Sequence, residues 1–489
     1  MLSHIQLDPQ SETPLYRQLF DLIRDQIESG TLARGERLPP TRELAVQLGL
    51  NRTTVSAAYE RLETDRLIQG HVGRGSFVRG PEPRIALAWE QVLAEDEGLR
   101  LAGAAPEAAI SFATSRPSER LFPLDDFRLT CAEVLASSRA AQILQLGSPA
   151  GYAPLREHLA EGARSEGAAR AGDDVVVTSG CQQGLDLLQR VLVRPGDTVI
   201  VEDPVYPGLR TLFQHSGAHL AGIPVGPSGI DIDALERAMA AHPPRLVVVT
   251  PNFQNPTGAT MPLDSRLALL RLARQARAVL AENDIYGGLR YAGERVPTIK
   301  ELDDTGDTVL LRSFSKIAFP GLRVGWVVAP HPLAARLAEA KQWTDLHTDQ
   351  LSQAILLRFA ESGRLAAHHA RIVAAGAERL HAVLEACERR LPAGSRFSRP
   401  QGGMNLWVRL PEPLDAGELL GRAQREGVSY LPGRFFAVSR HEPGGLRLSF
   451  AGLEPAEIRK GVAVLGEVFA DEMDRVRRTG RPGPAPAMV

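Results

Sequence analysis

Apolar residues recur at helical spacing in three stretches between residues 14 and 64, and each stretch has boundary residues typical of a helix. The first helix is predicted to start at Pro14 and to stop at Gly30, and the second to start at Thr41. Asn51 is the predicted cap of the third helix, and two short apolar runs around a glycine-rich turn follow in LIQGHVGRGSFV. Two helices joined by a short turn and followed by a hairpin predict a winged helix-turn-helix, which we place at residues 12–80.

From about residue 110 the pattern changes to short β-branched runs that alternate with helical segments. The runs are DVVVTSG, DTVIVEDP, RLVVVTP, AVLAEND and DTVLLRSFS. Apolar strands separated by helices indicate an α/β fold, with a mainly parallel sheet that is covered on both faces. From about residue 345, helices accompany strands at GMNLWVRL and GGLRLSFA, which predicts a smaller α+β lobe. This second domain is expected at residues 111–475.

Two stretches lack such patterns. Residues 81–110 combine proline, glycine, alanine and acidic residues, and we expect them to form a linker with at most one amphipathic helix. Residues 476–489 end in GRPGPAPAMV and are expected to be a disordered tail. The chain therefore divides into a small domain, a linker, a large domain and a tail.

Composition narrows the classes of protein that fit this layout. Of the 489 residues, 44% are hydrophobic and 23% are charged, which is ordinary for a globular protein of more than one domain. The net charge of −2 gives no general attraction to nucleic acid or anionic membranes, so any such binding must be local. The cysteines, Cys131, Cys181 and Cys387, are too few and too scattered for a disulfide framework or a metal site. No signal-peptide pattern and no long uncharged apolar stretch is present, which predicts a cytoplasmic protein.

The stretch TVLLRSFSKIAFPGLRVGW places a lysine, Lys316, just after an apolar run that ends at Ser313. Lysine is rare in this chain and occurs only at positions 300, 316, 341 and 460, whereas arginine is common. An amine at the carboxyl end of a strand in an α/β sheet is suited to Schiff-base chemistry. Arg312 and Arg323 could supply the field that lowers its pKa and a clamp for phosphate. The alternative is that Lys316 is an ordinary surface charge.

Four other polar stretches follow predicted strands or lie within one. TSGCQQG opens a helix, where backbone N–H groups could hold a phosphate or merely cap the helix. NFQNPTG brings Asn255 to a position where a side-chain amide can reach a ligand, and AENDIYGGLRY ends another strand with polar residues. GGLRLSFA places Arg447 inside an apolar strand, where an unpaired guanidinium is costly. Arg447 therefore either binds an anionic ligand or has an internal ion-pair partner.

Four motifs, which follow one another along the chain as NPTG, NDIY, SFSK and GLRLSF, complete a resemblance. Over residues 110–470 these motifs resemble those of fold-type I pyridoxal-phosphate aminotransferases. The stretch that runs from LPPTRELAVQLGLNRTTVSAAYERLETDRLI to GRGSFV resembles a GntR-type winged helix. The whole chain is similar to transcriptional regulators of the MocR subfamily.

The resemblance implies roles for individual residues. Lys316 would form an imine, the internal aldimine, with pyridoxal 5'-phosphate, and Tyr206 in EDPVYPG would stack on the pyridine ring. Asn255 and Tyr286 would hydrogen-bond the phenolic oxygen, and Arg447 would receive a ligand carboxylate, for which a planar guanidinium is suited. The residues implied to surround the phosphate are Ser179, Gly180, Cys181, Gln182, Ser313, Ser315 and Arg323. On this interpretation arginine serves elsewhere because Lys316 alone must attack a carbonyl.

Two positions depart from the pattern of those aminotransferases. Cys181 stands where a small hydroxyl residue is common, so one hydrogen bond to the phosphate would be missing. The acid that pairs with the pyridinium nitrogen stands three residues before the tyrosine, a position that Asn283 holds here, with Asp284 next to it. Neighbouring residues of a strand point to opposite faces, so both cannot face the ring while the strand continues. We expect Asn283 nearest the nitrogen, which would weaken the electron sink and make catalysis poor.

The N-terminal domain is not basic overall, since residues 1–80 hold ten arginines and ten acidic residues, and this argues against DNA binding. The distribution argues for it, because basic or short polar residues stand where a winged helix meets phosphates and base edges. These residues are Arg42, Asn51, Arg52, Thr53, Thr54 and Ser56. The resemblance implies a wing tip that reaches the minor groove with His71, Gly73, Arg74 and Gly75. The alternative is a three-helix dimerisation module.

The sequence leaves two functions open. The first is a homodimeric transcription factor that binds double-stranded DNA at two half-sites and senses an amine, an amino acid or the vitamin B6 aldehyde through its cofactor. The second is a working class I/II aminotransferase with an accessory N-terminal domain, for which Lys316 and Arg447 are equally suited. A cofactor-free relic is disfavoured, because the lysine and its phosphate-binding residues are retained together.

Overall fold

The computed structural model describes residues 6–71, 75–79, 89, 108–440 and 442–479 of the chain. The chain divides into two compact units, residues 1–97 and residues 98–489, and each is described by itself. The division falls within the stretch predicted to be a linker, most of which lies outside the described residues.

The smaller unit contains three helices and a hairpin, as the apolar pattern predicts. Its elements are α1 (Leu15–Glu28), α2 (Thr41–Leu48), α3 (Arg52–Thr64), β1 (Ile68–His71) and β2 (Gly75–Val78), with the two strands antiparallel. Asn51 caps α3, because its side chain accepts a hydrogen bond from the backbone N–H of Thr53 at 3.1 Å. Gly49 ends α2 in the left-handed region at φ 63°. Leu19, Val55 and other inward-facing side chains pack together into one hydrophobic core.

The larger unit is built on an eight-stranded sheet of order β4-β11-β10-β9-β8-β5-β6-β7. Its strands are β4 (Asp173–Thr178), β5 (Thr198–Asp203), β6 (His219–Gly226), β7 (Gly229–Ile230), β8 (Leu246–Val249), β9 (Val279–Asn283), β10 (Val309–Ser313) and β11 (Gly325–Pro330). Strands β10, β9, β8, β5 and β6 are parallel neighbours, whereas β11 lies antiparallel between β10 and β4. The prediction of a mainly parallel sheet is confirmed, and the five predicted runs form β4, β5, β8, β9 and β10.

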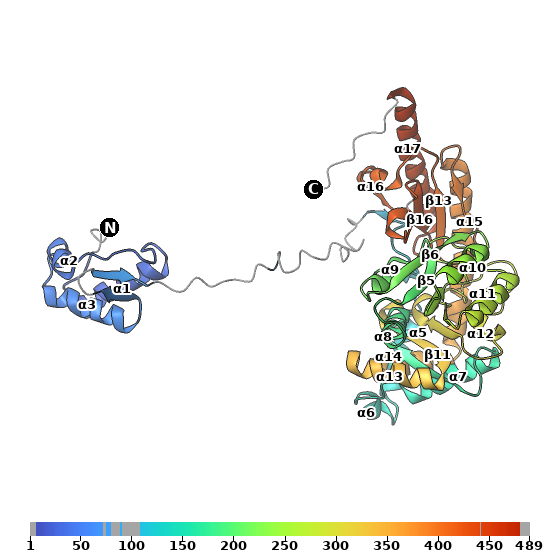
Figure 1. Ribbon diagram of the computed structural model, residues 1–489, viewed down its shortest axis with the longest axis horizontal. Helices are drawn as coiled ribbons and strands as arrows, with labels where there is room; N and C mark the ends of the chain where they lie inside the picture. The colour runs from blue at the N-terminus through green and yellow to red at the C-terminus, as the bar shows by residue number, and fades with distance from the viewer. Residues whose placement is uncertain (1–5, 72–74, 80–88, 90–107, 441, 480–489) are drawn as a thin grey trace. The chain divides into compact units, whose positions relative to one another are not determined.

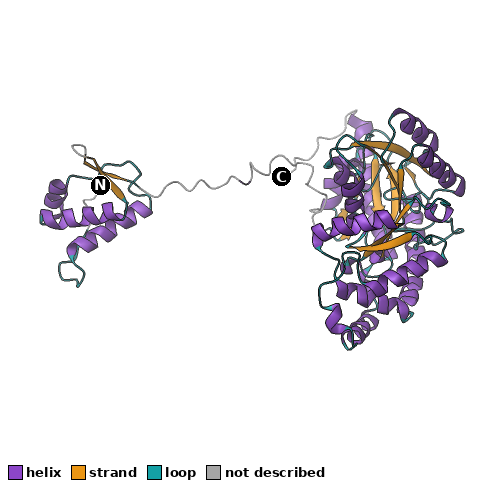
Figure 2. Cartoon of the chain, turned by 60° about the horizontal axis from the view of Figure 1, so that its bottom comes forward, coloured by secondary structure: helices purple, strands orange, loops and turns teal. Residues whose placement is uncertain are grey.

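Helices cover both faces of this sheet (Figures 1 and 2). One face packs against α8 (Cys181–Leu192), α9 (Pro207–Gln214) and α13 (His331–Asp345). The other face packs against α5 (Leu124–Leu135), α7 (Ala153–Ser165), α10 (Ile232–Ala241), α11 (Leu263–Gln275) and α14 (Gln350–Glu361). Strands that are apolar along their whole length require such cover on both sides.

The predicted α+β lobe follows in the chain. Its antiparallel sheet has the order β12 (Arg396–Phe397), β13 (Asn405–Arg409), β16 (Gly445–Ser449) and β15 (Leu431–Pro432). The lobe also contains α15 (Arg364–Arg390), α16 (Ala416–Arg425) and α17 (Pro455–Thr479). Strand β3 (Ile110–Ser111) joins it by pairing in parallel with β14 (Val428–Ser429). Helix α17 continues into the stretch expected to be a tail, and residues 480–489 lie outside the described residues.

The connections at the carboxyl ends of the parallel strands carry the polar motifs. Between β10 and β11 the chain forms two 3₁₀ turns, η4 (Phe314–Lys316) and η5 (Pro320–Leu322). The other short helices are α6 (Ala140–Ile143), α12 (Ile299–Leu302), η3 (Glu119–Leu121) and η6 (Gly433–Phe435). Within the described ranges, no helix has both the length and the apolar character needed to cross a membrane.

Candidate functional site

A cavity of about 500 Å³ opens at the carboxyl ends of the parallel strands, where the sheet meets the α+β lobe. Most residues predicted to bind the cofactor or the ligand line it: Cys181, Gln182, Tyr206, Asn255, Asn283, Tyr286, Ser313, Ser315, Lys316, Arg323 and Arg447. They come from the segments that follow β4, β5, β8, β9 and β10 and from strand β16. Ligands of open α/β sheets bind at this edge, so the topology alone makes the cavity a candidate site.

Lys316 ends the turn η4 and lines this cavity. Its Nζ donates a hydrogen bond to the backbone oxygen of Ser115 at 2.7 Å and lies 5.8 Å from the centroid of the Tyr286 ring. The ion pairs that lysines form within the described residues involve Lys300 and Lys341, and none involves Lys316. A half-buried amine without a counter-ion can form a bond with an aldehyde once it loses its proton. This placement argues against an ordinary surface charge.

Two of the other lysines are structural, which the sequence pattern did not indicate. Lys300 is buried, with its Nζ 3.1 Å from Asp173 and donating to the backbone oxygen of Gly306 at 2.8 Å. Lys341 is buried on α13, with its Nζ 2.6 Å from Asp345. The chain therefore keeps lysine for buried ion pairs as well, and that Lys316 alone must attack a carbonyl stays a prediction.

The turn between β4 and α8 forms one wall of the cavity. Gly180 has φ 88°, and a Cβ built on it would lie 2.4 Å from Arg323 Nη2, so only glycine lets this guanidinium close against the turn. Arg323 Nη2 donates to the backbone oxygen of Ser179 at 3.2 Å. The first N–H groups of α8 follow, at Cys181 and Gln182, and they form the positive end of the helix dipole. Amides and a guanidinium arranged in this way suit a phosphate.

Two of the residues predicted to bind phosphate, Ser179 and Cys181, have side chains that are poorly placed or poorly suited to donate a hydrogen bond to it. The Ser179 hydroxyl lies 3.4 Å from Asp345 Oδ2 and 3.3 Å from Thr348 Oγ1, so its backbone rather than its side chain shapes the wall. Burial raises the pKa of the Cys181 thiol to about 12. A neutral thiol is a weak donor, so Cys181 offers little hydrogen bonding, as its departure from the aminotransferase pattern predicts. Of the other residues predicted to bind phosphate, Ser315 donates its backbone N–H to Ser313 Oγ at 3.0 Å.

Asn283 and Asp284 point in different directions where β9 ends. Asn283 lines the cavity, and its Oδ1 is buried without a hydrogen-bond partner. Asp284 instead accepts hydrogen bonds from Asn252 Nδ2 at 2.8 Å and from Arg312 Nε at 3.1 Å. It lines a separate cavity of about 690 Å³. The amide therefore faces the candidate site and the carboxylate does not, in agreement with the alternation of a strand.

Three further side chains reach the cavity from loops. Tyr206 is 41% exposed, and a Cβ built on Gly208 would lie 2.5 Å from its ring, so this glycine lets the ring lie close to the backbone. Tyr286 is buried beside Lys316. Asn255 Oδ1 accepts a hydrogen bond from Arg447 Nη1 at 3.0 Å, which leaves the Nδ2 of Asn255 for a ligand.

Arg447 is buried in the middle of β16 and lacks a counter-ion. Besides its bond to Asn255, it donates from Nη2 to the backbone oxygen of Ala113, and its guanidinium lies 5.1 Å from the centroid of the Phe436 ring. Its Nε is buried without a partner. Burial lowers its pKa to about 10, and no carboxylate of the described residues pairs with it. The alternative that Arg447 has an internal ion-pair partner is therefore wrong, and a ligand carboxylate is the natural partner of this cation.

Sequence reasoning missed several residues that line the cavity. Ala113, Thr114 and Ser115 follow β3, Thr250 follows β8, and Arg210 lies within α9. The polar run ATSRP after the apolar pair of β3 was a local signal for residues 113–115. Its position next to Lys316 depends, however, on the pairing of β3 with β14, which comes from a distant part of the chain.

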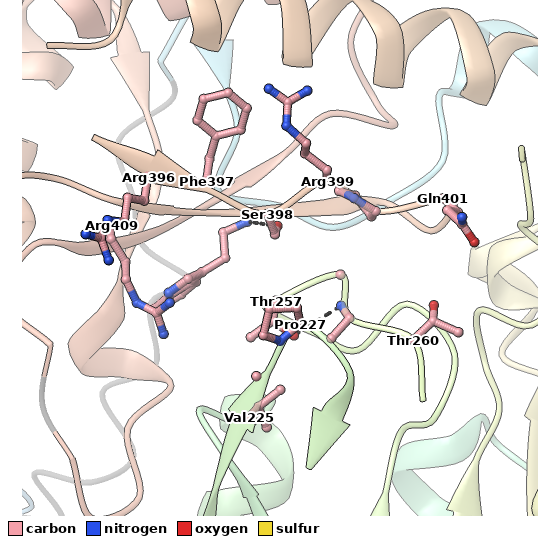
Figure 3. A pocket seen from close by; sticks show the side chains of 15 residues that line it. Val225, Pro227, Thr257, Thr260, Arg396, Phe397, Ser398, Arg399, Gln401 and Arg409 are labelled. Atoms are coloured by element: carbon pink, nitrogen blue, oxygen red, sulfur yellow. Dashed lines mark hydrogen bonds between the residues drawn. The ribbon is translucent and has the colours of Figure 1, made fainter. Parts of the chain in front are cut away.

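A second cavity, of about 590 Å³, is drawn in Figure 3. It lies between the loop of Thr257 and Thr260 on one side and the strand residues Arg396 and Phe397 on the other. Thr257 belongs to the same loop as Asn255, and Trp407, which also lines the second cavity, is the cross-strand partner of Arg447. The loop that supplies Asn255 therefore contributes to both cavities, and the strand β13, which pairs with the strand of Arg447, contributes to the second.

The predicted DNA-contacting residues lie at helix starts and on the hairpin of the smaller unit. Asn51, Arg52 and Thr53 are exposed at the start of α3, Arg42 is exposed on α2, and Thr54 and Ser56 are half-buried. The ion pairs within the described part of this unit involve Arg24 and Arg61, so Arg42 and Arg52 keep their guanidinium groups unpaired there. His71 ends β1 and Gly75 begins β2, whereas Gly73 and Arg74 lie outside the described residues.

Family models match both units of the chain. Residues 119–465 match the family described as aminotransferase class I and II, and residues 15–78 match the bacterial regulatory proteins of the gntR family. The larger unit is therefore an aminotransferase class I and II domain, and the smaller one is a GntR-type helix-turn-helix.

Individual relatives fall into regulators and enzymes. The chain is 31% identical to the probable rhizopine catabolism regulatory protein MocR of Rhizobium meliloti, over 95% of each chain. It is 37% identical to aromatic-amino-acid aminotransferase 1 of Thermococcus litoralis, over 75% of this chain and 89% of that one. The structure of LysN, the α-aminoadipate aminotransferase of Thermus thermophilus, complexed with N-(5'-phosphopyridoxyl)-L-leucine, matches with a TM-score of 0.73 and 33% identity, over 80% of this chain and 100% of that one. The protein belongs to the MocR-type regulators of the GntR family, and its cofactor is pyridoxal 5'-phosphate.

Proposed function

We propose that this transcription regulator senses a small amine or amino acid, or the vitamin B6 aldehyde itself, in the cavity around Lys316. The observation that carries the proposal is Arg447, a buried guanidinium without a carboxylate partner in the cavity that Lys316 lines. Pyridoxal phosphate, when bound, supplies an aldehyde carbon that primary amines attack and a ring that withdraws electrons. Lys316 would hold that carbon until a ligand amine replaces it, while Arg447 would receive the ligand carboxylate.

The other lining residues would hold the cofactor in place. The amides of Cys181 and Gln182, with Arg323 and the hydroxyls of Ser313 and Ser315, would bind the phosphate. Asn255 and Tyr286 would reach the phenolic oxygen, Tyr206 would stack on the ring, and Asn283 would meet the ring nitrogen. The fit is supported by the side chain of Asn283, whose Oδ1 is buried without a partner and whose amide would hydrogen-bond the ring nitrogen.

Sensing requires a difference between two states. The ligand must bind one arrangement of the two units more tightly than another, because equal affinity for both shifts nothing. The segment between the units is where we propose that this change occurs. DNA is the target of a GntR-type domain, and we propose a cytoplasmic location for that reason.

We further propose that the protein acts as a homodimer. Large apolar side chains are exposed near the turn between β4 and α8, which we call the phosphate turn. They are Leu144 (66%), Leu146 (73%), Trp343 (88%) and Leu346 (56%). Gln350 donates to the backbone oxygen of Gln145 at 2.6 Å, and this contact brings the segments of these side chains together. Exposed apolar surface of this kind marks a protein interface. A second copy would present a second α3 to a second half-site.

The proposed function is tested by absorbance spectroscopy of the full-length protein. The protein is loaded with pyridoxal phosphate and titrated with a panel of amino acids and amines, while keto acid is assayed in the same samples. A saturable change of the cofactor band without release of keto acid supports sensing. Steady production of keto acid over many turnovers supports the aminotransferase instead, and a flat spectrum with every amine would refute both.

Replacing Asn283 tests whether this residue is the reason that we expect the site to catalyse transamination poorly. In Asn283→Asp we expect keto acid formation from a bound amino acid to rise by about tenfold or more, since a carboxylate stabilises a protonated ring nitrogen and an amide does not. Rates are measured in single-turnover experiments. Asn405→Asp, which changes a buried asparagine outside the cavity, controls for a general effect of an added carboxylate. An unchanged rate in Asn283→Asp would show that Asn283 is not what limits the chemistry.

Replacing Arg52 tests the proposed DNA surface. We expect Arg52→Ala to weaken binding to operator DNA by about tenfold and to lower the slope of log affinity against log salt by about one, because one phosphate contact is lost. Arg61→Ala is the control, since Arg61 lies near the end of the same helix and pairs with Asp65 at 3.9 Å. If affinity and salt slope both stay at the wild-type values in Arg52→Ala, α3 is not the recognition helix.

A further inference from the structure

A side-chain network around the buried Lys341 contacts the turn between β4 and α8, and none of its three side chains, which are Lys341, Asp345 and Gln183, lines the cavity. Lys341 Nζ lies 2.6 and 2.7 Å from the two carboxylate oxygens of Asp345, and it also donates to Gln183 Oε1 at 3.1 Å. Gln183 Nε2 in turn donates to Asp345 Oδ2 at 2.7 Å. The same Gln183 Oε1 accepts the backbone N–H of Ser179 at 2.7 Å. The three side chains therefore form a closed ring of hydrogen bonds that contacts Ser179 twice, at its backbone N–H through Gln183 and, at 3.4 Å, at its hydroxyl through Asp345.

The lysine in this ring fixes the orientation of the glutamine amide. Lys341 is 0% exposed on α13, where a buried ammonium is tolerated only if its donors are satisfied. Its donors reach both oxygens of Asp345 and the oxygen of Gln183, while Asp345 takes the glutamine N–H. With a cation on one side and a carboxylate on the other, the amide can present only its oxygen toward Ser179. Without Lys341, this preference for one orientation is lost.

The peptide that the network holds is the one that positions the phosphate turn. The N–H of Ser179 is bound by Gln183, and its carbonyl oxygen is bound by Arg323 Nη2 at 3.2 Å. Gly180 comes next, and the free amides of α8 follow it. We propose that Lys341 and Asp345, acting through Gln183, are positioning residues for the cofactor phosphate. The proposal rests on the proposed function, because it assigns the α8 turn to the phosphate of the cofactor.

A comparison of two ligands separates positioning from a merely structural role. The dissociation constants of full-length protein for pyridoxal phosphate and for pyridoxal, which lacks the phosphate, are measured by absorbance titration. In Lys341→Met we expect pyridoxal phosphate to bind about tenfold or more weakly, the size of a lost charge-assisted hydrogen bond, while pyridoxal changes by less than about twofold. A general loosening of the fold would weaken both ligands alike, and the ratio of the two constants would then stay at its wild-type value.

The chain supplies a matched control and a second variant. Lys300→Met removes the other buried, ion-paired lysine, which contacts Asp173 away from the cavity, and it should lower thermal stability without changing the ratio. Gln183→Met keeps the Lys341–Asp345 pair and removes only the amide, so it should reproduce the changed ratio, and it carries the test if Lys341→Met does not fold. An unchanged ratio in Gln183→Met, or equal changes of the ratio in Lys341→Met and Lys300→Met, overturns the proposal.

The wild-type protein separates failure of this inference from failure of the proposed function. If wild type binds pyridoxal phosphate no better than pyridoxal, the cavity is not a phosphate site and both proposals fall. If wild type prefers pyridoxal phosphate and the variants keep that preference, only the positioning role of Lys341 and Asp345 is overturned.

Discussion

In Lys316→Ala we expect borohydride to trap no cofactor on the chain, whereas wild-type protein should give about one adduct per chain, at residue 316. Lys316 is the lysine that lines the cavity. Lys300 and Lys341 are held in buried ion pairs, and Lys460 is exposed on α17. With this amine gone, no other lysine within the described residues can reach the aldehyde carbon. The absorbance of the bound cofactor should therefore change to that of a free aldehyde.

The Lys316→Ala variant should still bind the cofactor, because the turn between β4 and α8, which we propose holds the phosphate, does not depend on the Lys316 amine. Arg323 closes against Gly180 through the backbone of Ser179, with no contribution from Lys316. Peptide mass analysis after reduction locates any adduct. Lys460→Ala serves as the control and should give the wild-type adduct. An adduct that persists in Lys316→Ala, or a wild-type adduct on another peptide, would contradict the assignment.

In Arg447→Met we expect a carboxylate-bearing ligand to bind about a hundredfold more weakly, which is the loss of a bidentate, charge-assisted pair in a buried site. An amine of the same chain without a carboxyl group should change by less than about threefold. The physical reason is that Arg447 has no carboxylate partner among the described residues, so a ligand carboxylate would be its first counter-ion. The measurement is a spectral titration of the loaded protein with L-leucine and with isopentylamine, and then with other such pairs.

Arg434→Met is a suitable control for this comparison. Arg434 belongs to the same lobe and is exposed, with its guanidinium 5.2 Å from the centroid of the Phe435 ring. It should leave both titrations close to wild type. If Arg447→Met weakens the amino acid and the amine by the same factor, Arg447 supports the shape of the cavity and does not recognise a carboxylate.

The strands and the order of domains could be read from the sequence because their signals are local. Five β-branched runs predicted five strands of the central sheet, and Thr41 and Asn51 marked helix boundaries that the structure has. The place of β11 between β10 and β4 has no such signal, since strand order depends on contacts between distant segments. Strand β6 was not among the predicted runs, because the glycine and proline residues in HLAGIPVG interrupt its β-branched pattern.

The sequence predicted the site residues that stand at the end of a strand or just after it. It did not predict the residues that tertiary contacts bring to the site. Lys316 and Asn283 stand directly at the ends of apolar runs, so their place at the sheet edge followed from the sequence. Ser115 reaches Lys316 through strand pairing in the α+β lobe. The buried Lys341 was missed for another reason: a single charged residue on a helix predicts solvent exposure, and only the structure shows Asp345 and Gln183 around it.

The smaller unit has a hydrophobic interior of its own. Leu19, Val55 and their neighbours close a core to which only residues of this unit contribute. Damage to the larger unit, even a substitution that unfolds it, should therefore leave an intact DNA-reading module on the same polypeptide. We expect alleles that lose Lys316 or Arg447 but keep the proposed dimer surface to be insensitive to the signal while still occupying their operators, and so to be dominant over the wild-type gene rather than silent.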